Sequence, residues 1–173
     1  MKALTIYQPW ASLVIAGAKP YEFRGWNPRE RGPAYAALIG QRIAIHASAK
    51  VIDRRESNYL MAVLRQRDMH PDLAAETCLI AEKALPILSR LLDGGGLPRS
   101  CILGTGVLGE PRNGIEIAEE FGVSRANDSD RDAHANWGWP MLDIEPFETP
   151  IPARGFQGFW NWQEAHDAAA MFG

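Results

Sequence analysis

The chain has 173 residues, of which 46% are hydrophobic and 23% charged, and it contains two cysteines. This length and composition are typical of one globular domain, and they exclude a disordered chain, a collagen-like fibre and a disulfide-dense scaffold. We expect residues 1–173 to form a single intracellular, cytoplasmic domain, with no signal peptide and no apolar run of the ~20 residues that a membrane span needs.

The net charge of −3 is unevenly distributed along the chain. Residues 1–70 contain 11 Lys and Arg against 5 Asp and Glu, whereas residues 71–173 contain 7 against 16. A basic half can attract phosphate groups even when the whole chain is acidic. The alternative is an uneven but functionless distribution over a solvated surface.

The first fifty residues predict strands around one short helix. Pro9 suits the first turn of that helix, because its missing N–H costs nothing there, and Gly17 suits the end. The predicted elements are a strand at 2–7, a helix at 9–17, strands at 21–26 and 42–47, and a loop at 27–34 that is rich in Pro and Gly.

The middle of the chain is helical and the rest returns to strands. Apolar residues at helical spacing predict two amphipathic helices within 53–92, with Pro86 as a kink or break. The later predicted elements are a strand at 101–108, a polar and acidic surface segment at 111–136 with a short helix near 115–121, strands at 139–147 and 159–162, and a closing helix at 163–172.

This order of elements predicts the α+β class. The predicted order is one strand, one helix, two strands, a set of helices and then three strands. This order fits a small mixed β-barrel with flanking helices and a two-helix insertion at about 53–92. They do not show the regular βαβ alternation of a doubly wound sheet.

The segment GAKPYEFRGW places Lys19, Glu22 and Arg24 within six residues. If 21–26 is extended, Glu22 and Arg24 point to the same face, with Lys19 at the corner before them. A cation, a carboxylate and a guanidinium could grip a planar polar ligand or a phosphate, or transfer protons if burial shifts a pKa. The alternative is a surface ion-pair ladder of little energy.

The strand at 42–47 leads into a second set of polar residues. His46 and Ser48 share a face, with Lys50 beyond them, which permits acid–base chemistry. A structurally satisfied histidine is the alternative. The four histidines are scattered without metal-ligand spacing, so we expect no metal site, and GTGVLG at 104–109 lacks the pattern of a phosphate loop.

Six tryptophans lie in or near the predicted strands. Core packing is their default role, although one or two near the basic residues could stack on a base. Trp10 and Trp26 flank the Lys-Glu-Arg segment and are the candidates.

Four motifs in order resemble the ASCH domain, a branch of the PUA-like superfamily of small β-barrels associated with RNA. The first two are QPWASLVIAGAKPYEFRGW and GQRIAIHAS, and the later two are ILGTGVLGE and the closing segment WGWPMLDIEPFETPIPARGFQGFW. The residues that meet the pattern are Gln8, Pro9, Trp10, Gly17, Lys19, Glu22, Arg24, His46, Ala47, Ser48, Trp137, Pro150, Gly155, Gly158 and Trp160.

The resemblance implies a barrel with a cleft lined by the Lys-Glu-Arg segment and an RNA or nucleotide ligand. One bacterial branch of the family hydrolyses the amide of acetylated cytidine, and other relatives have been proposed to cleave RNA. Lys19 matches the lysine of that amide chemistry. Glu22 replaces the hydroxyl residue that the branch uses, and Pro20 replaces the threonine that often follows the lysine.

Three functions follow as hypotheses, all without a cofactor and with the oligomeric state left open. The first is binding of RNA or a modified nucleoside between 17–26 and 42–50. The second is a hydrolase for an N-acylated nucleoside or RNA, with Lys19 and Glu22 as catalytic residues. The third is a protein-interaction module that docks through 53–92. The predicted ligand-binding residues are Lys19, Glu22, Arg24, Trp10, Trp26, Arg42, His46, Ser48 and Lys50.

Overall fold

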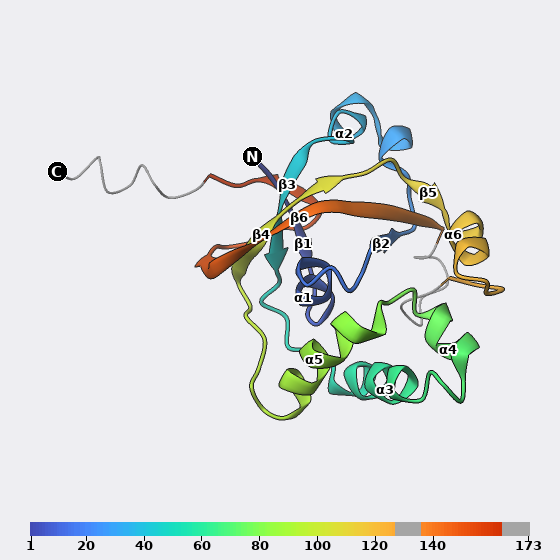
Figure 1. Cartoon of the computed structure of the whole chain (residues 1–173). Coiled ribbons are helices and arrows are strands. Elements are labelled where there is room, and N and C mark those ends of the chain that lie inside the picture. Colours follow the sequence, from blue (N-terminus) through green and yellow to red (C-terminus); the bar gives the residue numbers. More distant parts are fainter. Residues whose placement is uncertain (127–135, 164–173) are drawn as a thin grey trace.

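The computed structural model describes residues 1–126 and 136–163 and confirms the α+β class (Figure 1). One mixed sheet curls into a half-barrel in the order β2-β6-β4-β3-β1-β7, and β5 pairs with β6. The strands are β1 (Lys2–Ile6), β2 (Tyr21–Arg24), β3 (Arg42–Ala47), β4 (Cys101–Leu108), β5 (Arg112–Asn113), β6 (Trp137–Pro152) and β7 (Phe159–Asn161).

The parallel pair β1 and β3 positions part of the candidate site. Thr5 pairs in register with His46, and the other strand pairings in the sheet are antiparallel. Ile43 and Ile45 of β3 pack on one face of the sheet, whereas Ala44 packs with Trp162 on the other. Burial on both faces explains why β3 reads as a nearly continuous apolar run.

The helices comprise η1 (Pro28–Arg31), a 3₁₀ turn, and α1 (Trp10–Ile15), α2 (Pro33–Ala36), α3 (Arg54–Arg65), α4 (Pro71–Glu76), α5 (Ala81–Leu92) and α6 (Gly114–Glu120). Helix α1 packs between the sheet and the other helices. Its Ala11 and Val14 join the core under the sheet, and its Leu13 joins the core formed by α3 and α5. Trp10 packs against both cores, so the two meet at the first residue of α1.

Residues 54–92, which we call the helical segment, contain three helices instead of the two predicted. The additional helix α4 begins with Pro71, and Asp72 lies in its first turn, where a carboxylate favours a helix start. Pro86 does not break α5, because the apolar stripe of that helix, including Leu88 and Leu91, is buried in the core. The segment is joined to the half-barrel by a hydrogen bond of 2.8 Å from the Ile80 N–H to the Ala18 carbonyl.

Other boundaries differ from the prediction. The loop predicted at 27–34 contains η1 and the first residues of α2. The Asn27 side chain accepts a hydrogen bond from the Arg29 N–H and caps η1. Strand β6 is longer than predicted, and its register shifts against β4 allow it to bend along the curled sheet. The helix predicted at 163–172 and much of the acidic segment at 111–136 lie outside the described residues. Among the described residues, no helix is long and apolar enough to cross a bilayer.

Candidate functional site

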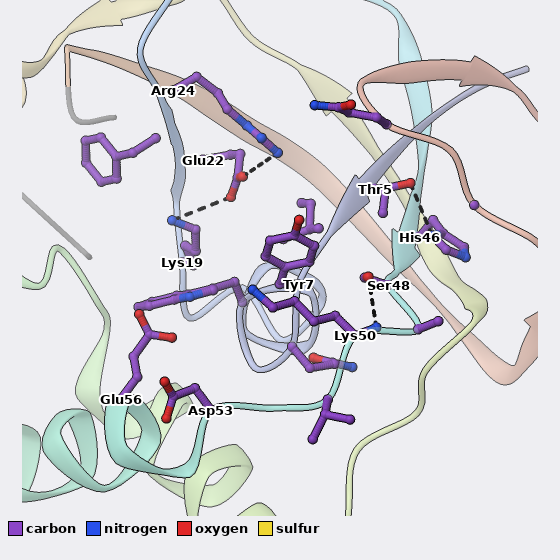
Figure 2. A pocket seen from close by; sticks show the side chains of 18 of the residues that line it. Thr5, Tyr7, Lys19, Glu22, Arg24, His46, Ser48, Lys50, Asp53 and Glu56 are labelled. Atoms are coloured by element: carbon purple, nitrogen blue, oxygen red, sulfur yellow. Dashed lines mark hydrogen bonds and ion pairs between the residues drawn. The ribbon is translucent and has the colours of Figure 1, made fainter. Parts of the chain in front are cut away.

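A pocket of about 1840 Å³ lies between the half-barrel and the helical segment. Its walls come from the end of β1 and the residues after it, the Lys19–Arg24 stretch, the end of β3, the segment 153–158, and α3 and α4. Figure 2 shows Lys19, His46 and Glu56 on three of these walls. Six cationic and four carboxylate side chains line it, so the pocket is polar with a small excess of positive charge. Seven of the nine predicted binding residues line this pocket: Lys19, Glu22, Arg24, Trp10, His46, Ser48 and Lys50.

Lys19, Glu22 and Arg24 form a continuous ionic chain. The Lys19 Nζ lies 3.6 Å from Oε2 of Glu22, and the Arg24 Nη2 lies 2.8 Å from Oε1 of the same carboxylate (Figure 2). The chain turns at Gly17, which has a φ of +64°, and the Lys19 N–H donates to the Leu13 carbonyl. Strand β2 then places Glu22 and Arg24 on one face, as the period of two requires. The spacing therefore brings all three groups together.

The Lys19 ammonium is buried between aromatic rings. Its Nζ lies 5.1 Å from the ring centroids of both Trp10 and Phe23, and the side chain is only 2% exposed. Burial lowers the pKa of Lys19, while the charge of Glu22 opposes that shift and the charge of Arg24 adds to it. A buried amine next to a carboxylate can donate hydrogen bonds to an anion, or lose its own proton more readily than an ordinary lysine.

Arg24 forms the outer end of this ionic chain. Its guanidinium lies 5.7 Å from the ring centroid of Trp139, and its side chain is 28% exposed. The Nε atom is buried and has no hydrogen-bond partner among the described residues. The planar guanidinium beside this ring is therefore held in place with donor capacity left, which suits recognition of a phosphate or a base edge.

His46 is buried at the far side of the pocket. Its Nε2 lies 3.0 Å from the Ala153 carbonyl, which can only accept, so Nε2 carries the proton. Its Nδ1 lies 3.2 Å from Oγ1 of Thr5, and that hydroxyl also lies 2.7 Å from the Phe156 carbonyl. A Cβ on Gly155 would lie 2.1 Å from Cε1 of His46, so the close approach of this segment needs a glycine. These contacts fix segment 153–158 to β1 and β3.

We expect the pH dependence of stability to report on His46. Burial lowers its pKa below the ordinary value of 6.5, so the unfolded chain binds the proton more tightly than the folded chain. The contribution of neutral His46 to stability is therefore complete above pH 6.5 and is lost as the pH falls through and below that value. The free energy of unfolding, measured with denaturant between about pH 5 and pH 8, should fall less on acidification for His46→Gln than for the wild type. Parallel profiles of the two proteins would contradict this assignment.

Ser48 and Lys50 continue the pocket wall beyond β3. The Ser48 Oγ accepts a hydrogen bond of 3.1 Å from the Lys50 N–H, which shapes the turn (Figure 2). The Lys50 Nζ lies 4.4 Å from the ring centroid of Tyr7, a contact between a cation and an aromatic face. The Ser48 side chain therefore stabilises the backbone turn after β3, while Lys50 and Tyr7 form part of the pocket rim.

The structure places Trp26 and Arg42 outside the pocket. Trp26 packs edge-on against Trp139, with ring centroids 4.7 Å apart, and the Arg31 guanidinium lies 4.6 Å from its ring centroid. Arg42 begins β3 whereas His46 lies near its end, a separation of roughly 13 Å along a strand. Arg42 pairs there with Asp143 and Glu145. Neither side chain lines the pocket that contains Lys19.

The sequence prediction missed one whole wall of the pocket. Asp53, Glu56, Tyr59 and Glu76 line it from the helical segment and the residue before it. That region was predicted as amphipathic helices and as a docking surface for a protein, and none of its residues was predicted to bind the ligand. Residues 153–158 also line it, and Gly155 in the closing motif was the available signal for that close approach. The described residues contain no group of three or more His, Cys, Asp or Glu placed to hold a metal ion.

Comparison with known proteins found similarity at the level of structure. No protein-family model matches the sequence, and a search of the curated proteins gave no match. A crystal structure of ASCH from Zymomonas mobilis is similar with a TM-score of 0.48 and 13% identity, covering 98% of this chain and 92% of that chain. A mutant of the same Zymomonas mobilis protein gives a TM-score of 0.47 and 13% identity, with 98% and 94% covered.

Proposed function

We propose that the chain binds RNA or a modified nucleoside in the pocket between the half-barrel and the helical segment. The observation that carries the proposal is the ionic chain of the buried Lys19 and Glu22 with the partly exposed Arg24, which opens into a pocket with further cations and aromatic rings. The motifs that resemble the ASCH domain support the same ligand class.

Each group has a task in this function. Lys19 and Arg24 donate to phosphate oxygens or base acceptors, and Glu22 holds both cations in position. Trp10 and Tyr7 offer ring faces, and Lys50 adds positive charge at the rim. The volume of about 1840 Å³ exceeds the roughly 300–1,000 Å³ of pockets for small ligands, which favours a segment of several nucleotides over a single nucleoside.

Binding of short RNA and nucleosides, measured between about 50 and 200 mM salt, tests this function. We expect wild-type binding that weakens as salt rises, and Arg24→Gln and Lys50→Gln should each lower RNA affinity by roughly ten- to a hundredfold, the range for a lost charged hydrogen bond. The control Arg29→Gln removes a cation that pairs with Glu110 at the surface, outside the pocket, and should bind like the wild type. Salt-insensitive binding, or pocket variants that bind as well as the wild type, would refute the proposal.

A hydrolase is the second candidate, and the lowered pKa of Lys19 beside Glu22 favours it. An amine that is neutral more often than an ordinary lysine can accept the proton of an attacking water. Acting on N4-acetylcytidine, such an enzyme would add water across the amide and release acetate and cytidine. Acetate release by the wild type that is lost in Lys19→Arg would support this activity. Full turnover in Glu22→Gln would remove Glu22 from the chemistry.

The third hypothesis, docking of a protein through the helices, gains no support from the apolar residues of the helical segment. The apolar stripes of α3 and α5 are buried against each other and against α1. Four large hydrophobic side chains of this segment are exposed. Tyr59 and Leu73 line the pocket, whereas Met69 and Ile80 lie outside it as single exposed residues, which are normal on a protein surface.

A further inference from the structure

Exposed hydrophobic side chains gather around the pocket. Of the ten large hydrophobic side chains that are exposed in the described residues, five line this pocket, with exposed fractions from 44% to 78%. They are Tyr7, Val51, Tyr59, Leu73 and Phe156. Exposed apolar surface concentrated on one hollow marks a binding surface, and three of these five side chains carry aromatic rings.

The charges of the pocket are divided between its two walls. Glu22 is paired with Lys19 and Arg24, and the other three carboxylates, Asp53, Glu56 and Glu76, all belong to residues 53–76. Four of the six cations belong to the half-barrel side: Lys19, Arg24, Lys50 and Arg154. Arg55 of α3 is the one cation that residues 53–76 contribute, so three carboxylates face one cation on that wall. Figure 2 shows Asp53 and Glu56 at the start of α3, with the half-barrel residues Lys19, Tyr7 and Lys50 on the other side.

Carboxylates oppose phosphate binding, so their position restricts how a nucleic acid can lie in the pocket. Residues 53–76 have an excess of carboxylates over Arg55, so phosphates are favoured on the half-barrel side, where cations are in excess. The bases of the same strand must then face the helical segment. A carboxylate on that wall can accept a hydrogen bond from the amino group of a base, as Asp and Glu do from N4 of cytosine. Uracil has a carbonyl at that position and would be disfavoured.

We propose that the helical segment and Asp53 at its start form the base-reading wall of the pocket: Tyr59 stacks on a base, and the carboxylates of Asp53, Glu56 and Glu76 select bases with an amino group. This inference rests on the proposed RNA-binding function and adds its sequence preference. Asp53 also caps α3, where it accepts a hydrogen bond of 2.8 Å from the Arg55 N–H. A carboxylate has about four acceptor sites, so the cap leaves capacity for a base.

Oligo(C) and oligo(U) of equal length are the test ligands, because the two bases differ at the amino position while the phosphates are the same. We expect wild-type protein to bind oligo(C) about tenfold more tightly than oligo(U). The triple variant Asp53→Asn, Glu56→Gln and Glu76→Gln should bring that ratio close to one. Asparagine retains the ability to cap α3, so the variant should fold.

A matched control separates selection from general electrostatics. The variant Asp68→Asn, Asp72→Asn and Glu82→Gln removes the same number of charges from the helical segment, outside the pocket. It should retain the preference for oligo(C), whereas both triple variants should bind oligo(U) no more weakly than the wild type does. Tyr59→Ala should weaken binding of both oligonucleotides by about tenfold, and Tyr59→Phe should restore it, since stacking needs only the ring.

The outcomes distinguish this inference from the function on which it rests. Equal wild-type binding of oligo(C) and oligo(U), or a preference that survives in the pocket triple variant, overturns the base-reading wall and leaves RNA binding intact. Absence of salt-sensitive binding to either oligonucleotide overturns both.

Discussion

Replacing Trp139 by alanine is expected to lower the free energy of unfolding by about 3–5 kcal/mol. Trp139 is fully buried, stacks on Phe159 with ring centroids 5.7 Å apart, and meets Trp26 edge-on at 4.7 Å. Its indole N–H donates a hydrogen bond of 3.2 Å to the Trp26 carbonyl. The substitution removes all these contacts and leaves a cavity under the half-barrel, which the surrounding strands cannot fill completely.

Chemical denaturation followed by circular dichroism measures this loss. Trp137→Ala is the control, because Trp137 lies two residues earlier in β6 and is only partly buried, so its loss should cost less. Trp139→Ala should also weaken RNA binding at temperatures where it is folded, since Trp139 supports the Arg24 guanidinium. A variant as stable as Trp137→Ala would contradict the central place of Trp139 in the core.

Replacing Glu22 by alanine is expected to lower the free energy of unfolding by about 3–5 kcal/mol at neutral pH, as much as replacing Trp139. The change leaves the buried Lys19 ammonium next to Arg24 without the carboxylate that lies between them. The matched variant Glu110→Ala breaks an ion pair of 2.5 Å with Arg29 at the exposed surface, and it should change stability far less. If Glu22→Ala and Glu110→Ala lowered the free energy of unfolding equally, burial would not strengthen the Glu22 interactions.

The pH dependence of Glu22→Ala identifies the cause of its instability. Burial lowers the pKa of Lys19 from 10.5, and the Glu22 charge opposes that shift, so the variant lowers the pKa further. The unfolded chain then binds the proton more tightly, and stability is lost as the pH falls below 10.5 and regained as it rises. Glu22→Ala should therefore become steeply more stable between about pH 7 and pH 10, whereas the double variant with Lys19→Met should not.

Cys78 affects the same pH range but does not disturb this comparison. Burial raises the pKa of its thiol from 9.0 to about 12, so its contribution to stability is lost as the pH rises above 9. The single and double variants both retain Cys78, so the difference between them excludes most of its contribution. If the difference in the free energy of unfolding between the single and double variants did not change with pH, the unpaired Lys19 ammonium would not be the cause of the instability.

Local sequence patterns were sufficient to predict an element where the residues of one short segment determine its structure. The strands at 42–47 and 101–108 have the predicted bounds, because short runs of apolar and β-branched residues favour an extended backbone within each strand. The turn η1 was missed although it begins with a proline, because the Pro and Gly content of 27–34 was interpreted as a loop. Helix α4, which also begins with a proline, was not predicted as a separate helix. Pro86 shows the opposite limit, since burial of the stripe on α5 outweighs the local cost of a proline.

The same division applies to the candidate site. Spacing alone placed Glu22 and Arg24 on one face of a strand with Lys19 beside them, because strand geometry fixes which side chains are neighbours. It could not exclude Trp26 or Arg42, whose partners at Trp139 and Asp143 lie more than a hundred residues away. The contacts of His46 with Ala153 and the wall at Asp53–Glu76 likewise depend on how remote segments pack.

The amino-acid sequence by itself therefore determined the α+β class, the principal strands and the local group of Lys19, Glu22 and Arg24. Only the tertiary structure decided that this group opens into a pocket, that the helical segment forms the opposite wall, and that the walls differ in charge. The physical reason is that periodicity specifies which face of an element is apolar, whereas the surface that this face meets depends on packing between segments far apart in the chain.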